Sequence, residues 1–396
     1  MSGTNVSAAV PYLDLKPQYR AMEAAINARI KTVLEHGQFI LGPEVEESEK
    51  ALAAFAGTKY CLTAASGTDA LVMALMALGV GPGDEVITTA FSFFATAEVI
   101  SLVGATPIFA DIDPVTFNLD PIKTEAMITG KTKAIMPVSL YGQPADFAAF
   151  EKISKKHGIP VIEDAAQSFG AAYNPAGDAR CSGCSVPVGQ KCGGCKSGAL
   201  GIIGATSFFP AKPLGCYGDG GAVFTSDENL YKKMSIIRVH GQESRYHHVA
   251  IGINGRLDTL QCTILLEKLK RYGWEIERRQ RVASKYSGAF EGLAPKLITP
   301  KVMSDRQSVW AQYTVLVQDR DAFAKALKEK GVPTSVHYPS PLHHQPVYRE
   351  LRDKFNLPET EKAAKLCICL PLYADMPDAD VERVIKAVKD VVGSAS

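Results

Sequence analysis

Between about Ala51 and Glu163, short apolar runs of strand type alternate with longer apolar patterns of helical spacing. The short runs are ITT, PIFA, AIMPV and PVIED, which begin near positions 87, 107, 134 and 160. This alternation predicts βαβ units and an α/β fold with a mostly parallel, helix-covered sheet. Ligands bind beyond the carboxyl ends of the strands in such open sheets, so the residues just after each run are candidates for a site.

The pattern changes twice further along the chain. The stretch 173–200 is rich in Gly, Ser, Pro and Cys and is typical of an inserted loop. Strand-type segments resume at TSFFP and AVFTS, and helical spacing runs from about 257 to 281. Scattered Pro, Lys and Ser near 296–306 then lead into YTVLV, a helix near 321–330, TSVHY and a final helix ending near 392. We predict a large domain over 1–290, with the insertion at 173–200, and a small α+β domain over 291–396.

Composition narrows the functional classes. Lys and Arg number 43 against 42 Asp and Glu, so no broad basic surface is available for nucleic acid. No signal pattern opens the chain and no apolar run reaches the roughly 20 residues of a membrane span. We therefore expect a cytoplasmic protein that binds neither nucleic acid nor membrane.

Lys212 is the first candidate for chemistry. It lies in SFFPAKPLGCYGDGGA, directly before a Gly-rich turn that could hold its amine over a site. An amine that is positioned and partly desolvated suits imine formation with a carbonyl cofactor. The alternative is an ordinary surface lysine.

Gly67, Thr68 and Ser207 are candidates for binding a phosphate group. ASGTDA opens an apolar helical pattern, so Gly67 and Thr68 lie at a helix N-terminus, where free amides attract anions. Ser207 could add a hydroxyl to the same phosphate. Ser-Gly-Thr-Asp is also an ordinary helix cap, which remains the alternative.

Asp164 ends the strand-type run PVIED, and its carboxylate could face the ligand. It would then pair with the protonated nitrogen of a pyridine ring and keep that ring an electron sink. Gln167, one helical turn later, could reach the phenolic oxygen of the ring. The alternative is that Asp164 caps the following helix.

The order of the motifs SGTDAL, GVGPGDEVI, FSFFATA, LYGQ, IEDAAQSFGA, SFFPAKPLG, GDGGA, HGQ and NGRLDTLQ resembles the DegT/DnrJ/StrS family of sugar aminotransferases. The resemblance covers nearly the whole chain, because YLDLKPQY, GQFILGPEV, VHYPSPLHHQ and LPLY are similar too. It implies the type I aminotransferase fold, pyridoxal 5′-phosphate (PLP) as cofactor, and a homodimer with active sites at the subunit interface.

The resemblance also implies roles for single residues. Lys212 would carry the cofactor covalently and serve as acid and base, and Asp164 would hold the pyridine nitrogen. Gly67, Thr68 and Ser207 would bind the phosphate, joined by Asn254 from the other subunit, and Phe93 would stack on the ring. Without the resemblance, FSFF indicates a buried core residue at Phe93.

Within the family, PVSLYGQ, KPLGCYGDGGA, RYHH and NGRLDTLQ resemble the enzymes that act on UDP-2-acetamido-2-deoxy-3-oxo-glucuronate and form its 3-amino sugar. A uronate needs a carboxylate clamp, which Arg256, His337 and Tyr338 could provide. Arg256 as a surface ion-pair partner is the alternative. By analogy, glutamate is the expected amino donor.

Cys181, Cys184, Cys192 and Cys195 form two CxxC pairs within the insertion, where most members of the family have a short loop without cysteines. Four thiolates at this spacing predict a zinc site or an iron–sulfur cluster, with a structural role as the default. Free thiols or redox disulfides are the alternatives.

Two other functions compete with transamination. One is an iron–sulfur sugar deoxygenase or dehydratase that uses pyridoxamine phosphate, but in those relatives histidine replaces the lysine found here at Lys212. The other is a binding or sensing protein without enzymatic activity, controlled by metal in the insertion.

Overall fold

The computed structural model describes residues 9–174 and 195–394. A seven-strand array forms its centre, in the spatial order β1 (Tyr60–Ala64), β9 (Gly221–Thr225), β8 (Ile203–Ser207), β5 (Ile162–Asp164), β4 (Thr132–Met136), β2 (Glu85–Thr89) and β3 (Thr106–Ala110). Isolated parallel bridges join β4 to β5, and only β9 runs antiparallel to its neighbours. The predicted mostly parallel sheet is therefore confirmed.

Helices cover the sheet: α2 (Pro43–Ala56), α3 (Gly67–Ala77), α4 (Ala95–Leu102), α5 (Pro121–Ala126), α6 (Phe147–His157) and α7 (Glu228–Ile237). The α3 helix is apolar on most sides and lies in a buried cluster with β1, β2, β8 and β9. Each fully buried Leu or Met side chain there contributes about 1.5–3 kcal/mol to the stability of the fold. This burial fixes the N-terminus of α3 against the ends of β8 and β9.

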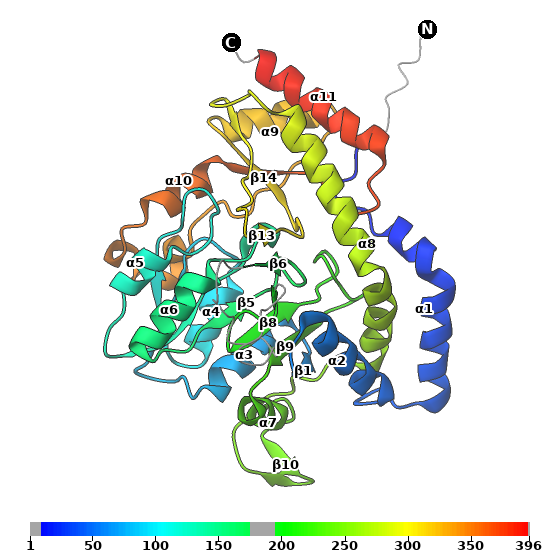
Figure 1. Ribbon diagram of the computed structural model, residues 1–396, viewed down its shortest axis with the longest axis vertical. Coiled ribbons are helices and arrows are strands. Elements are labelled where there is room, and N and C mark those ends of the chain that lie inside the picture. The colour runs from blue at the N-terminus through cyan, green and yellow to red at the C-terminus, as the bar shows by residue number, and fades with distance from the viewer. Residues whose placement is uncertain (1–8, 175–194, 395–396) are drawn as a thin grey trace.

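Two long helices frame one side of the molecule. They are α1 (Lys16–His36) and α8 (Thr259–Ala289), and α8 runs from the central sheet to the C-terminal part of the chain (Figure 1). A hairpin of β10 (Gln242–Ser244) and β11 (His247–His248) follows α7 and projects from the molecule (Figure 1). No helix within residues 9–174 and 195–394 is long and apolar enough to cross a membrane.

The C-terminal part contains the antiparallel sheet β12 (Leu297–Ile298), β14 (Tyr313–Val317) and β15 (Cys367–Leu370), with α9 (Arg320–Glu329), α10 (Pro358–Leu366) and α11 (Asp378–Ser394). Short 3-10 turns lie at η1 (Leu140–Gly142), η2 (Leu342–His344), η3 (Pro346–Tyr348) and η4 (Arg352–Lys354). TSVHY forms no strand and makes only the bridge Ser335–Cys369. Tyr286 of α8 packs in the same hydrophobic cluster as Tyr313 of β14, so α8 contributes to this core as well.

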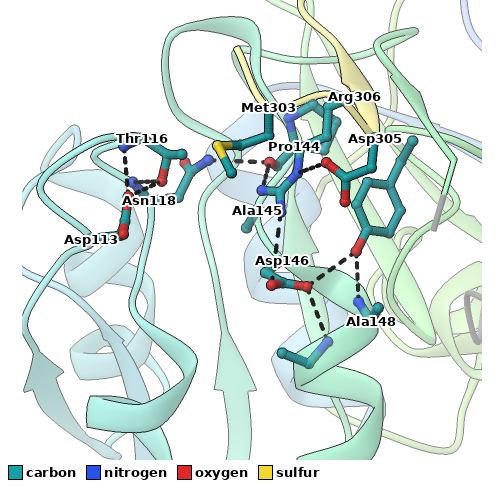
Figure 2. Close-up of polar contacts among 12 residues, drawn as sticks. Asp113, Thr116, Asn118, Pro144, Ala145, Asp146, Ala148, Met303, Asp305 and Arg306 are labelled. Carbon is teal, nitrogen blue, oxygen red and sulfur yellow. Dashed lines mark hydrogen bonds and ion pairs between the residues drawn. The ribbon is translucent and has the colours of Figure 1, made fainter. Parts of the chain in front are cut away.

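A small antiparallel sheet lies at the base of the insertion, where β6 (Ala172–Tyr173) pairs with both β7 (Cys195–Lys196) and β13 (Arg306–Gln307). Figure 2 shows the polar contacts around it: Arg306 donates to the carbonyl oxygen of Pro144 (2.8 Å) and forms an ion pair with Asp146 (3.8 Å). The Asp146 carboxylate also caps α6 by accepting from the amide of Ala149. These contacts tie the C-terminal segment to the central sheet.

Candidate active site

The N-terminus of α3 and the end of β8 meet where the sequence predicted a phosphate site. A Cβ atom built on Gly67 would lie only 2.6 Å from the Cβ of Ser207, so a side chain at Gly67 would collide with Ser207. The Ser66 side chain caps the amide of Asp69 (3.0 Å). Among the described residues no acceptor is seen for the amides of Gly67 and Thr68, and free amides at a helix N-terminus suit a phosphate group.

Glycine at the start of β9 makes this close approach possible. A Cβ atom on Gly221 would lie 2.4 Å from the carbonyl oxygen of Ser66, and Gly221 pairs with Ser207 across β8 and β9. Any other residue at 221 would therefore push the start of α3 away from the strand. The GDGGA motif serves here to bring backbone elements together.

Asp164 is buried at the carboxyl end of β5, with 4% of its surface exposed. Its Oδ2 accepts from the hydroxyl of Thr96 (2.9 Å) and its Oδ1 from the amide of Ala166 (3.1 Å). Burial raises the pKa of Asp164, while these two donors and the nearby positive charge of Lys212 lower it. Residues 166–170 form a turn instead of the expected helix, so the carboxylate organises a turn and also interacts electrostatically with Lys212.

Lys212 is half-buried in a tight turn after β8. Its amide donates to the carbonyl oxygen of Phe209 (2.8 Å), and Gly215 is packed so closely that an added Cβ would lie 2.6 Å from the same oxygen. Burial lowers the pKa of the Lys212 amine, and the negative charge of Asp164 opposes this effect. The amine is thus partly desolvated beside a carboxylate, as imine chemistry requires.

His337, Tyr338 and Gln167 lie beside this pair. The pKa of His337 is lowered mainly by burial and to a smaller extent by the charge of Lys212. Its Nδ1 lies 3.5 Å from the sulfur of Cys369. The Gln167 amide donates to the Tyr338 hydroxyl (3.1 Å) and its Oε1 accepts from the amide of Tyr141 (3.0 Å). The structure therefore brings Lys212, Asp164, Gln167, His337 and Tyr338 into one group.

Phe93 is not a core residue: 57% of its surface is exposed. Its ring centroid lies 6.4 Å from that of Tyr338, at the edge of the group around Asp164. The core position indicated by FSFF alone is therefore wrong, and an exposed ring beside the site is available for stacking.

Asn254 and Arg256 belong to a separate strand-like segment. Gly255, between them, accepts at its carbonyl oxygen from the amide of Ala65 (2.9 Å), which places the segment beside the start of α3. Asn254 is exposed, and the buried Nε of Arg256 has no partner within the described part of the chain. Neither residue shares a described hydrogen bond or ion pair with the group around Lys212.

Cys181, Cys184 and Cys192 of the predicted metal site lie outside the described residues. Cys195 is described: it is buried in β7 and pairs with Tyr173 of β6.

Sequence reasoning missed several residues that shape the site. Thr96 contacts Asp164 directly, and Ser92 lies 3.0 Å from the Thr96 hydroxyl. Glu163 accepts hydrogen bonds from Ser197, Gly198 and Leu200. Burial raises its pKa to about 7, although these hydrogen bonds act to lower it. The sequence contains these groups, as the hydroxyls of FSFFATA and the two acids of IED. Their partners lie far along the chain, so no local pattern could link them.

Comparisons with known proteins agree with this geometry. The profile of the DegT/DnrJ/EryC1/StrS aminotransferase family matches residues 20–389. A Pseudomonas aeruginosa protein, UDP-2-acetamido-2-deoxy-3-oxo-D-glucuronate aminotransferase, is 49% identical over 96% of this chain and 99% of its own. UDP-N-acetyl-3-dehydro-alpha-D-glucosamine 3-aminotransferase of Acidithiobacillus ferrooxidans is 36% identical over 96% of this chain and 97% of its own.

Solved structures show the same fold. The crystal structure of S. venezuelae DesV in complex with a ketimine intermediate superposes with a TM-score of 0.89 at 36% identity, covering 98% of this chain and 99% of that one. The NtdA structure from Bacillus subtilis, with bound cofactor PMP, gives 0.87 at 32% identity and covers 98% of this chain and 86% of that one. The predicted aminotransferase fold is therefore confirmed.

Proposed function

The chain belongs to the DegT/DnrJ/EryC1/StrS aminotransferase family, and on this premise we propose that it aminates carbon 3 of a 3-keto UDP-sugar with PLP as cofactor. The proposed substrate is a UDP-2-acetamido-2-deoxy-3-oxo-glucuronate, with glutamate as amino donor by analogy with the family. The observation that carries the proposal is the buried Asp164 carboxylate beside the partly desolvated Lys212 amine.

The residues of the site fit PLP. Gly67, Thr68 and Ser207 would hold its phosphate, and the exposed ring of Phe93 would cover its pyridine ring. Asp164 would hold the proton on the pyridine nitrogen, because its negative charge favours the protonated ring. When bound, the cofactor supplies an electron-withdrawing ring that stabilises a carbanion at the amino-bearing carbon.

Lys212 supplies the amine for covalent attachment and the base for proton transfer. Its lowered pKa leaves more of the neutral form near neutral pH than an exposed lysine would have. Asp164 limits that shift, so the same amine can also hold a proton and return it. An acid and base of this kind operates best when its pKa lies near the working pH.

A uronate substrate is supported by one guanidinium and by two polar side chains that could bind its carboxylate. Arg256 carries a buried Nε without a described partner, which suits a bidentate carboxylate contact. His337 and Tyr338 already lie beside Lys212 and Asp164. Within the described chain no contact joins Arg256 to His337 or Tyr338. We therefore propose that the three residues that bind the carboxylate come from two subunits.

Sharing of the site requires a homodimer, which we also propose. Phe39, Ile40 and Leu41 are 46–50% exposed, and Ile40 forms a bridge with Asp258, close to Arg256. Tyr246 and Ile251 in the region of the β10–β11 hairpin are 80% and 85% exposed. Exposed apolar side chains near Asn254 and Arg256 support a subunit interface at this part of the surface.

For the insertion we propose that Cys181, Cys184, Cys192 and Cys195 bind zinc or an iron–sulfur cluster in a structural role. The support is the two CxxC pairs. In addition, β6 and β7 bring the ends of the insertion together beside Glu163, the neighbour of Asp164 in sequence.

The proposed reaction is tested by incubating the PLP-loaded protein with UDP-2-acetamido-2-deoxy-3-oxo-glucuronate and L-glutamate. Formation of the 3-amino sugar and 2-oxoglutarate, followed by mass spectrometry, is the expected result. A 4-keto UDP-sugar serves as the matched control. Turnover of the 4-keto sugar without turnover of the 3-keto sugar would refute the proposed position.

A further inference from the structure

Two histidines and a glutamate that the proposed reaction does not use meet where η2 packs against α10. His343 and His344 belong to η2, and Glu361 belongs to α10. The Nε2 atoms of His343 and His344 lie 3.8 Å and 3.6 Å from Oε1 of Glu361. The two imidazole rings are 4.1 Å apart between centroids, so all three side chains present ligand atoms to one small region.

The burial of His343 is what distinguishes this cluster from a surface ion pair. Its side chain is fully buried, and neither ring nitrogen has a hydrogen-bond partner within the described chain. The separation of 3.8 Å from Glu361 is too long for a hydrogen bond. A buried polar group without a partner costs roughly 1–3 kcal/mol, so such groups rarely persist without a ligand or a water.

We propose that His343, His344 and Glu361 form a zinc site. Imidazole nitrogen and carboxylate oxygen are common zinc ligands, with bonds of about 2.0–2.2 Å, which places tetrahedral ligands roughly 3.4 Å apart. The separations of 3.6 Å and 3.8 Å between the two histidines and Glu361 are within a few tenths of an ångström of that geometry, and all three ligand atoms lie within 4.8 Å of one another. The side chains of His344 and Glu361 are 27% and 51% exposed, which leaves an entry path and room for a water as fourth ligand.

A zinc ion at this position would join two segments that are already anchored separately. The amide of Leu342 donates to the carbonyl oxygen of Ala90 (2.8 Å), and Asp111 accepts from the amides of Glu359 and Thr360. Leu342 follows Tyr338 by four residues. Zinc would therefore stabilise the segment that carries Tyr338, and its role here is structural.

The experiment measures zinc binding by equilibrium dialysis and elemental analysis on the full, PLP-loaded chain. Cys181, Cys184 and Cys192 are first replaced by serine, so that the insertion cannot supply a thiolate site. In this background we expect one zinc per chain and a rise in melting temperature with added zinc. Co²⁺ in place of zinc should give visible bands without thiolate charge transfer.

Three variants in this background decide the assignment. H344Q and E361Q should each weaken zinc binding by more than about a hundredfold, because loss of a direct ligand exceeds the usual effect of an outer partner. H343Q should do the same, but H344Q and E361Q suffice if that buried variant fails to fold. H157Q is the matched control, since His157 contacts Glu125 at 2.8 Å on the surface and should leave binding unchanged.

The absence of zinc binding in the background that lacks Cys181, Cys184 and Cys192 would overturn the proposal. So would zinc binding that H344Q and E361Q leave at the level of H157Q. Neither outcome depends on turnover, so the zinc site and the aminotransferase reaction are tested separately.

Discussion

The hydroxyl of Thr96 donates a 2.9 Å hydrogen bond to Oδ2 of Asp164. The amide of Ala166 occupies Oδ1, so both carboxylate oxygens are oriented by the protein itself. Two donors favour the charged form of a carboxyl whose burial alone would favour the neutral form. Thr96, together with the amide of Ala166, therefore favours the charged Asp164 carboxylate that would hold a protonated pyridine nitrogen.

Thr96→Val should lower kcat by on the order of tenfold, because a hydrogen bond to a charged group is worth roughly 1.5–3 kcal/mol. The pKa of Asp164 should rise further, and KM for the sugar should change little. Steady-state kinetics with the keto-sugar measure both constants. Ser92→Ala is the control, since Ser92 contacts Thr96 and not Asp164, and an equal loss in that variant would argue against the special role of Thr96.

The pH dependence of Lys212 provides a second prediction. Burial lowers its pKa below 10.5 and Asp164 raises it, so the amine of the cofactor-free protein should titrate below the ordinary lysine range. Asp164→Asn removes the opposing charge and should lower the pKa of Lys212 further. The rate of labelling by a small amine-reactive reagent, followed by mass spectrometry across pH, measures this. A higher midpoint in the variant than in the wild type would contradict the predicted sign.

Local sequence patterns predicted most of the central sheet and its helices, and named part of the candidate site. Lys212, Asp164 and the Gly67–Thr68 amides could be named because each is marked by a short motif at the end of a strand or the start of a helix. Thr96 and Glu163 could not, because their roles depend on partners 68 and 34 to 37 residues away. Pairing over such distances is decided by packing and leaves no local periodicity.

Two segments depart from their local sequence patterns for physical reasons. TSVHY has the composition of a strand, but only Ser335 bridges to β15, after which the chain turns to bring His337 and Tyr338 beside Lys212. Phe93 lies in an apolar string typical of a core, yet its side chain is exposed at the edge of the site. Both departures occur at the proposed site, where binding of a ligand competes with regular packing.

Arg256→Ala should reduce kcat/KM for the uronate far more than for a matching substrate with a neutral 6-hydroxymethyl group. Loss of a buried partner of a carboxylate costs roughly 2–5 kcal/mol, whereas the neutral sugar loses little. Comparison of the two kcat/KM ratios measures the difference. Equal losses on both substrates would assign Arg256 a structural role or a phosphate contact instead.

Cys181→Ser should release the metal of the insertion and lower the melting temperature, while PLP absorbance and kcat of the remaining folded protein change only modestly. Elemental analysis and thermal unfolding of variant and wild type provide the measurement. Cys61→Ser is a suitable control, because Cys61 is buried in β1 and lies outside the insertion. A wild-type protein prepared anaerobically that contains no zinc or iron would refute the metal prediction for the insertion.

The most direct test of the central claim is to identify the lysine that carries the cofactor. Reduction of the PLP-loaded protein with borohydride and peptide mass spectrometry should place the pyridoxyl group on Lys212. Lys212→Ala should remain folded by circular dichroism, lose the modification and lose turnover by more than about a thousandfold. Lys268 provides an internal comparison, because burial lowers its pKa too, to about 8. Modification of Lys268 instead of Lys212, or near-normal turnover by Lys212→Ala, would contradict the account.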